Sequence, residues 1–290
     1  MINIKRFIIL NILFSSINCF ILPQIFREWH PIGIESKIDK TKPYVYNIGK
    51  LPLVLWYDNN NNTLSTVNIC KHFGARLDNG IINNGCLHCS NHFTLYNSSD
   101  TIGNVVSKNG LLWWSYKSFL KSPTQQFKKD MKLYNTYIDI DVNIVNVILE
   151  FIYNTNNKKQ MTRNINNKFF FKEILYNAEH RFVFKYPYYI KGNINKNIDY
   201  TFNFLPLDEN KTRIFISIIN NIDSKIYMNY YLNTKILNLK NYDNNSYLKY
   251  MIMMKDSKDN NMKNIYSLFD KYLVPNEFTV SCFYKYRQFY

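Results

Sequence analysis

The sequence has few of the residues that define several special classes of protein. Its 290 residues include only 5 cysteines, 8 glycines and 8 prolines. Five cysteines are too sparse for a disulfide-stapled scaffold, and so little glycine and proline excludes a collagen. The chain also lacks an internal repeat and a second long apolar run beyond its amino-terminal segment. A coiled coil and a multispan membrane protein are therefore excluded.

Charged residues are scarce as well, at 20% of the chain, whereas hydrophobic residues make up 46%. That apolar fraction provides enough surface to bury against chain entropy, so a disordered protein is excluded. A length of 290 residues allows one large domain or two of ordinary size.

The charge is one-sided, with 36 Lys+Arg against 21 Asp+Glu and a formal net charge of +15. A nucleic-acid-binding face gathers Lys and Arg with aromatic residues on one surface, whereas the basic residues here are spread evenly. Many lie in Asn- and Lys-rich stretches such as 154–167 and 255–264, a composition typical of AT-biased coding. We attribute the charge to composition and solubility, and expect no nucleic-acid partner.

Residues 1–22 have the pattern of a targeting segment. Lys5 and Arg6 precede an apolar run of about 14 residues, too short and too polar to span a bilayer. Phe20 resembles the Phe that opens the second half of bipartite presequences in algae with complex plastids. We expect a fusion of residues 1–30 to a reporter to enter the secretory route, or a plastid by a bipartite presequence. A buried amino-terminal segment is the alternative.

The rest of the chain predicts an α+β protein of two domains. Strand-like runs at 51–56 and 111–116, with hairpin-type turns at 58–60 and 78–80, predict an all-β domain over residues 23–120. A polar boundary follows at 122–130. Residues 121–290 predict an antiparallel sheet, with further strand-like segments at 137–153, 169–189, 201–205 and 213–219 and a terminal helix at 264–272.

The metal-binding residue types gather in one part of the first domain. Three of the five cysteines and three of the five histidines fall within residues 70–92. Cys70 and His72 form a C-x-H pair, and Cys89 and His92 form a C-x-x-H pair. In a Rieske centre one iron takes two Cys and the other takes two His, so each loop contributes one of each. Zinc sites more often use C-x-x-C or H-x(3–5)-H pairs, and zinc is the alternative.

These residues resemble the two cluster-binding boxes of the Rieske oxygenases. The boxes are Cys70-Lys71-His72-Phe73-Gly74-Ala75-Arg76-Leu77 and Leu87-His88-Cys89-Ser90-Asn91-His92-Phe93, in matching context at 29–33, 53–58 and 110–114. The match covers about 30–115 and is most similar to the plastid branch, pheophorbide a oxygenase and its relatives, with a fainter likeness at 186–187, 205–206 and 212–215.

The resemblance implies a [2Fe–2S] cluster with Cys70 and Cys89 on one iron and His72 and His92 on the other. Cys86 is then a packed thiol and His88 a solvated turn residue. Phe93 stands where the family has Gly, which predicts a different turn in the second loop. The implied fold is an all-β Rieske domain followed by an antiparallel-sheet α+β domain of the oxygenase catalytic, helix-grip type.

The second metal of this family, a mononuclear Fe(II) held by two His and one carboxylate, lacks a ligand set. The family's iron-binding motif would align at 147–157, where there is no histidine. Glu150 and Asn154 are at best faint remnants of that motif. His180 is the one imidazole of the second half and a weak candidate ligand. A strand-edge histidine satisfied by hydrogen bonds is the favoured interpretation.

Three hypotheses of function follow. The first is a Rieske oxidoreductase, a ring-cleaving or hydroxylating monooxygenase with a ferredoxin-type or reductase electron donor and a hydrophobic cyclic or tetrapyrrole-like substrate. The second keeps the cluster as an electron-transfer or ligand-binding protein with a degenerate oxygenase domain. The third is a structural zinc module. We expect the first, as an enzyme, and leave a homo-oligomer open.

Overall fold

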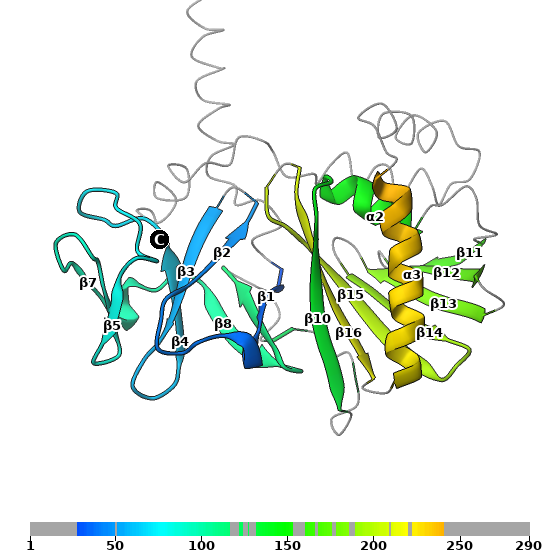
Figure 1. The fold of residues 1–290 in the computed structure, drawn as a ribbon, viewed down its shortest axis with the longest axis horizontal. Helices are drawn as coiled ribbons and strands as arrows, with labels where there is room; N and C mark the ends of the chain where they lie inside the picture. The colour runs from blue at the N-terminus through cyan, green and yellow to red at the C-terminus, as the bar shows by residue number, and fades with distance from the viewer. Residues whose placement is uncertain are drawn as a thin grey trace, which may run out of the picture.

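The computed structural model describes residues 28–240 with short gaps, at 50, 117–121, 124–126, 128–131, 153–159, 166–167, 176–177, 186–188, 209 and 220–221. Two β-rich parts lie side by side, the first half of the chain on one side and the second half on the other (Figure 1). The targeting segment expected at 1–22 and the terminal helix expected at 264–272 lie outside the described residues. Among the described residues, no helix has both the length and the apolar content that crossing a membrane requires.

The first half forms three small antiparallel sheets, as the turn-rich sequence predicts. Two of them, ordered β2-β3-β4 and β1-β9-β8, enclose a common core, and the third, β5-β6-β7, stands apart at the far end of the molecule (Figure 1). The strands are β1 His30–Ile34, β2 Tyr44–Ile48, β3 Leu51–Tyr57, β4 Thr63–Val67, β5 Ile81–Asn83, β6 Cys86–His88, β7 Leu95–Tyr96, β8 Asn104–Lys108 and β9 Leu111–Ser115. Two short 3-10 helices, Glu35–Lys37 and Ser98–Asp100, connect them.

The strands expected at 51–56 and 111–116 are confirmed as β3 and β9. The turn at 58–60 is a hairpin between β3 and β4, closed by the Asp58 carboxylate, which accepts from the amides of Asn60 and Asn62. Residues 78–80 do form a turn, but it is not the turn of a hairpin. It connects the loop that contains Cys70 and His72 to β5, and the partner of β5 is β6.

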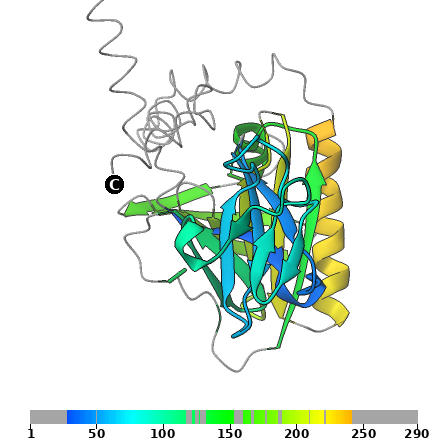
Figure 2. The same cartoon turned by 90° about the vertical axis from the view of Figure 1, so that its left-hand side faces the viewer.

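The second half contains one seven-stranded antiparallel sheet, ordered β10-β16-β15-β14-β13-β12-β11. The strands are β10 Leu133–Ile140, β11 Gln160–Ile165, β12 Lys168–Leu175, β13 Ala178–Lys185, β14 Tyr189–Ile194, β15 Ile198–Pro206 and β16 Thr212–Ile219. Helices α2 Ile144–Ile152 and α3 Ile222–Lys240 pack against one another on one face of this sheet, with α3 along its outer side (Figures 1 and 2). This is the antiparallel α+β arrangement expected from the sequence.

Helix α2 corrects the expectation of a strand through 137–153. Only the first part of that range is a strand, β10, and the Asn143 side chain then accepts from the Val145 amide at 2.8 Å and starts the helix. Every residue of α2 is buried. A helix buried on all sides has no polar face, so its sequence lacks the helical period of apolar and polar residues. Its β-branched residues therefore favour a strand in the sequence pattern.

Helix α3 was not expected at all. Its buried side chains recur at helical spacing, at Ser224, Met228, Tyr231, Leu232, Lys235 and Leu239. Two of these positions are polar, so the apolar period that would mark an amphipathic helix is interrupted.

The two halves share part of their core. Leu205 of β15 and Phe215 of β16 are fully buried in the hydrophobic cluster of the first half, with Leu53, Trp114 and their neighbours. The Gly49 amide donates to the Pro206 carbonyl at 2.7 Å across the same contact. The sheet of the second domain is therefore fixed against the first through its β15–β16 hairpin.

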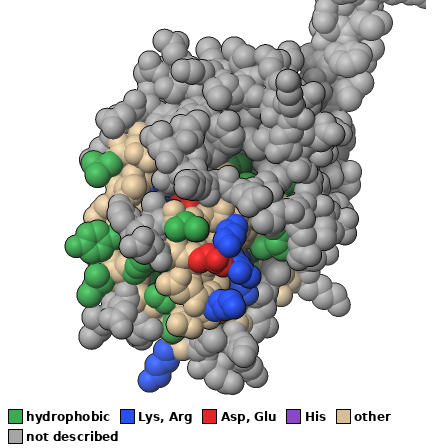
Figure 3. Space-filling view, turned by 90° about the vertical axis from the view of Figure 1, so that its right-hand side faces the viewer, with side chains coloured by type: hydrophobic (Ala, Val, Ile, Leu, Met, Phe, Trp, Pro, Cys, Tyr) green, Lys and Arg blue, Asp and Glu red, His purple; other side chains and the backbone are tan. Residues whose placement is uncertain are grey.

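The end of the second domain away from the first shows Lys and Arg side chains beside acidic ones (Figure 3). Among the described residues there, Glu179 pairs with Lys172 at 2.8 Å and with Arg181. The basic groups at this site thus share a carboxylate between them rather than forming a stripe of one sign.

Candidate metal centre

The first candidate loop follows β4 and turns tightly around its leading cysteine. The Cys70 amide donates to the Ala75 carbonyl at 2.7 Å, and the Gly74 amide donates back to the Cys70 carbonyl at 2.9 Å. The side chain of buried Asn68 accepts from the Leu77 amide at 2.8 Å and so closes the base of the loop. Gly74 has φ of 74°, a left-handed conformation that glycine adopts without steric cost.

The second loop, between β6 and β7, repeats this turn. The Cys89 amide donates to the Thr94 carbonyl, and the Phe93 amide donates to the Cys89 carbonyl, each at 3.0 Å. Phe93 therefore takes the place of Gly74 and has φ of 53°. The two loops of this chain therefore make the same turn, and an aromatic side chain in the second accepts a left-handed conformation that costs about 1–2 kcal/mol.

The two leading cysteines lie together in the interior. Cys70 and Cys89 are buried and belong to one small core with Val54, Trp56, Leu77, Leu87 and Tyr96. Burial raises the pKa of the Cys70 thiol, but hydrogen bonds, the largest from the Tyr96 hydroxyl, outweigh burial and lower the pKa to about 7. These bonds favour the thiolate, the form in which cysteine binds a metal.

The two histidines lie at the exposed end of the same loops. The rings of His72 and His92 have centroids 5.0 Å apart and are nearly perpendicular. Phe73, which is 75% exposed, lies against both, with ring centroids 4.1 Å from His72 and 5.5 Å from His92. The structure thus brings together all four residues expected from the sequence, with the thiols inside and the imidazoles outside.

This arrangement fits a binuclear iron–sulfur group better than zinc. Within the described part of the chain, no three side chains of His, Cys, Asp or Glu are placed around one point where a single ion would sit. A structural zinc ion takes four protein ligands, and a catalytic one takes three. A Rieske [2Fe–2S] group needs two protein ligands on each iron, since sulfide completes the coordination. A thiol pair and an imidazole pair meet that need.

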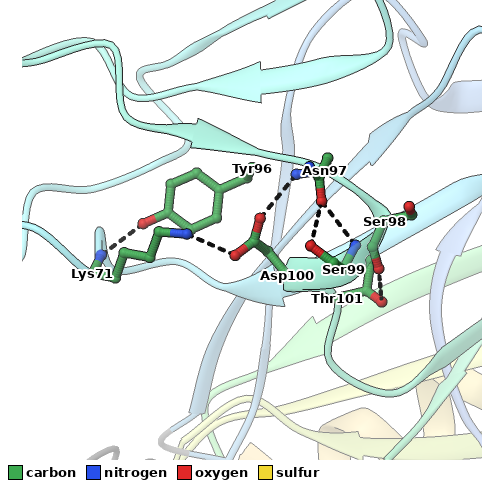
Figure 4. A network of polar contacts seen from close by, with 7 residues as sticks. All are labelled: Lys71, Tyr96, Asn97, Ser98, Ser99, Asp100 and Thr101. Atoms are coloured by element: carbon green, nitrogen blue, oxygen red, sulfur yellow. Dashed lines mark hydrogen bonds and ion pairs between the residues drawn. The ribbon is translucent and has the colours of Figure 1, made fainter.

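Tyr96 of β7 fixes the environment of Cys70. Its hydroxyl oxygen accepts from the Lys71 amide at 2.6 Å, which leaves the hydroxyl hydrogen available for the bond to Cys70 that lowers the pKa of this thiol. The Lys71 ammonium lies 5.0 Å from the centre of the Tyr96 ring and pairs with Asp100 at 2.7 Å (Figure 4). Asp100 in turn accepts from the Asn97 amide at 3.1 Å (Figure 4). The spacing of the boxes gave no sign of Tyr96, because its contact with Cys70 is made across the fold.

The remaining residues of the cluster region are structural. Cys86 is a half-buried free thiol in β6, as expected for a packed cysteine. His88 is a half-buried residue of the same strand, paired with Ile81 and Leu95. The expectation of a solvated turn at His88 is therefore wrong, because the strand runs to the residue before Cys89.

The interior of the second domain does not fit a mononuclear iron. His180 lies in β13, an inner strand rather than an edge, is fully buried, and its Nε2 is 2.7 Å from the Tyr227 hydroxyl. Glu150 is buried in α2, where its side chain pairs with Lys235. Asn154 lies outside the described residues. A site of two imidazoles and one carboxylate cannot be assembled here, since His180 is the one histidine of the second half.

Comparison with known proteins agrees with this geometry. Residues 28–113 match the family model of the Rieske [2Fe-2S] domain. The ferredoxin subunit of anthranilate 1,2-dioxygenase from Burkholderia cepacia is 28% identical over 65 residues, which is 22% of this chain. The match spans 59% of the length of that subunit.

Solved structures extend the likeness to the second domain. Dicamba monooxygenase superposes with a TM-score of 0.56 at 14% identity, covering 69% of this chain and 78% of the enzyme. NdmA of Pseudomonas putida CBB5, solved with caffeine, gives a TM-score of 0.58 at 12% identity over 85% of this chain and 89% of its own. At such identities the likeness is one of fold. The chain contains a Rieske [2Fe-2S] domain, joined to a sheet domain with the fold found in Rieske oxygenases.

Proposed function

We propose that this protein is a Rieske-type oxidoreductase whose cluster is held by Cys70 and Cys89 on one iron and by His72 and His92 on the other. The observation that carries the proposal is the pairing of two loops with the same turn, which brings a buried thiol pair and an exposed imidazole pair together. A [2Fe–2S] group bound there supplies one-electron transfer.

The exposed end of the two loops is the proposed contact for the electron donor, a ferredoxin-type protein or a reductase. His72 and His92 are exposed there, flanked by Phe73 and by Phe93, which is 66% exposed. Exposed aromatic groups around a redox site supply apolar contact area for a partner. The relative from Burkholderia cepacia, a ferredoxin subunit of a dioxygenase, supports electron transfer as the role of such a domain.

The likeness of the two boxes to the pheophorbide a oxygenase-like branch supports a finer version of this function. In that version the chain is a ring-cleaving or hydroxylating monooxygenase that acts on a hydrophobic cyclic or tetrapyrrole-like molecule, acts as a homo-oligomer, and reaches a plastid or the secretory route through residues 1–22. This version needs iron ligands other than two histidines in the second domain.

A second candidate is an electron-transfer or ligand-binding protein with a degenerate oxygenase domain. The specific observation in its favour is His180, which is buried and bonded to Tyr227 while no other histidine exists in the second half. One-electron transfer through the first domain requires no second metal.

Electron paramagnetic resonance of the reduced protein, with iron and sulfide quantitation, tests the proposal. A Rieske signal with about two irons and two sulfides per chain supports electron transfer, and about three irons support an oxygenase. Cys70→Ser and Cys89→Ser are expected to abolish the visible iron–sulfur absorption, whereas Cys86→Ser retains it. Zinc without sulfide, or bleaching by Cys86→Ser alone, would overturn the assignment.

A further inference from the structure

A buried group of charges lies between the two helices and the sheet of the second domain. Lys235 of α3 is fully buried, and its Nζ is 3.7 Å from Glu150 Oε1 of α2 and 3.6 Å from Glu173 Oε1 of β12. Both carboxylates are also buried, with at most 1% of their surface exposed. Three elements distant in the sequence therefore each contribute one charge to a single interior point.

The ammonium group of Lys235 is held from several sides. It lies 3.4 Å from the Glu150 carbonyl oxygen and 5.5 Å from the centre of the Tyr231 ring. The Asn238 side chain donates to Glu150 Oε1 at 2.9 Å. A cation between them stabilises two carboxylates removed from water, since an isolated buried charge is strongly unfavourable. Lys235 supplies that cation from within the chain.

The neighbouring polar groups are aromatic hydroxyls and one imidazole. His180 stands opposite Glu173 on the adjacent strand, its ring stacks on Tyr231 with centroids 4.9 Å apart, and its Nε2 is bonded to the Tyr227 hydroxyl. Burial raises the pKa of Tyr200, which lies 6.4 Å from His180 between ring centroids, so this hydroxyl stays neutral. The Tyr200 hydroxyl therefore adds no further charge to the ion-paired group.

We infer that Lys235 is a built-in cation that occupies the place of a metal ion in this domain, and that the domain neither requires nor admits a mononuclear metal there. A divalent ion at the two carboxylates would stand within ion-pair distance of an ammonium group that is itself fully buried. Like charges at that separation in a buried site repel strongly. This inference concerns the second domain alone and goes beyond the proposed role of the cluster.

The first experiment uses the intact protein with its cluster. Its cluster is measured by visible absorption and sulfide content, and Co²⁺ is then titrated as a spectroscopic substitute for Fe²⁺. We expect iron and sulfide in equal amounts and no stoichiometric Co²⁺ band. A saturable Co²⁺ site that Glu150→Gln removes, with the cluster absorption unchanged, would overturn the inference. Loss of the cluster itself would instead count against the proposed function.

The second experiment removes the cation. Lys235→Met leaves two buried carboxylates without the cation that lies between them and is expected to lower the Tm by roughly 10 °C. Replacing both carboxylates by Gln in the same chain, Glu150→Gln and Glu173→Gln, is expected to restore most of that loss. Lys225→Met, on the same helix but half-exposed over Tyr134, is the matched control and leaves the Tm within about 2 °C.

A Lys235→Met protein as stable as the parent would overturn the inference. If Lys235→Met alone does not fold, recovery of a folded protein in the triple variant supports it. The Co²⁺ titration of the unmodified protein decides the question in either case.

Discussion

The hydroxyl of Tyr96 provides the sharpest test of the candidate metal centre, because one atom can be removed without changing the packing of the ring. Its oxygen accepts from the Lys71 amide, and its hydrogen is available for the bond to Cys70. Reduction adds negative charge to the cluster and its sulfur ligands, so this bond stabilises the reduced state more than the oxidised state. Tyr96→Phe is therefore expected to lower the reduction potential.

The size of this shift follows from one hydrogen bond. A net contribution of about 0.5–1.5 kcal/mol corresponds to roughly 20–60 mV for a one-electron couple, since a tenfold change in equilibrium is about 1.4 kcal/mol or 59 mV. Potentiometric titration followed by visible absorption or by the resonance signal of the reduced cluster measures it. The cation over the ring and the ion pair of Lys71 with Asp100 remain in the variant.

Tyr46→Phe is the matched control. Tyr46 is also buried in the first domain, but its hydroxyl is bonded to Ser65 at 2.7 Å and not to a candidate ligand. Its loss is expected to leave the potential unchanged. A rise in potential for Tyr96→Phe, or equal shifts for both variants, would refute the assignment of the Tyr96 hydrogen bond to a cluster ligand.

Three further outcomes are expected. Phe93→Gly relieves the left-handed backbone at an exposed position and leaves the free energy of unfolding unchanged or up to about 1 kcal/mol higher. Phe73 does not have a positive φ, so Phe73→Gly lowers the free energy of unfolding by about 0.5–1 kcal/mol. Equal effects of the two substitutions in chemical denaturation would contradict the strain at Phe93. Gly192→Ala places a methyl group 2.2 Å from the Tyr200 ring and is expected to lower the Tm by several degrees in a thermal scan. Hydrogen bonds from Arg76 hold the pKa of Asp78 below its ordinary value. The stability they add is therefore present above the unfolded pKa of Asp and is lost as pH falls through the folded pKa. Asp78→Asn should flatten this part of the acid-unfolding curve, and an unchanged curve would exclude a contribution of the Arg76–Asp78 pair to acid stability.

The sequence pointed to the four residues that the structure brings together, because the members of each pair are local. Cys70 and His72, or Cys89 and His92, are near neighbours in the chain, and each loop closes on itself by bonds between residues four or five apart. The strands around them alternate or are bounded by turns, so β3 and β9 were also predicted. Tyr96 was missed, since its contact with Cys70 depends on how two sheets face one another.

The second domain was predicted less well for a related reason. Helix α2 is buried on every side and α3 has Ser224 and Lys235 on its buried face, so neither shows a simple apolar period. The partners of Lys235 lie 85 residues away at Glu150 in helix α2 and in strand β12 at Glu173. No spacing in the sequence indicates that these three charges meet, whereas the lack of a second histidine could be counted directly.

The burial of Leu205 and Phe215 in the core of the first half gives the second sheet a role that is independent of chemistry. A chain cut after residue 120 would leave the cavity that these two side chains fill open to water, and the cluster-bearing fold would lose part of its own interior. The loss of metal-binding side chains from the second domain would leave this packing intact, whereas the loss of β15 or β16 would not. A protein that used only its first domain would therefore still depend on the packing of β15 and β16.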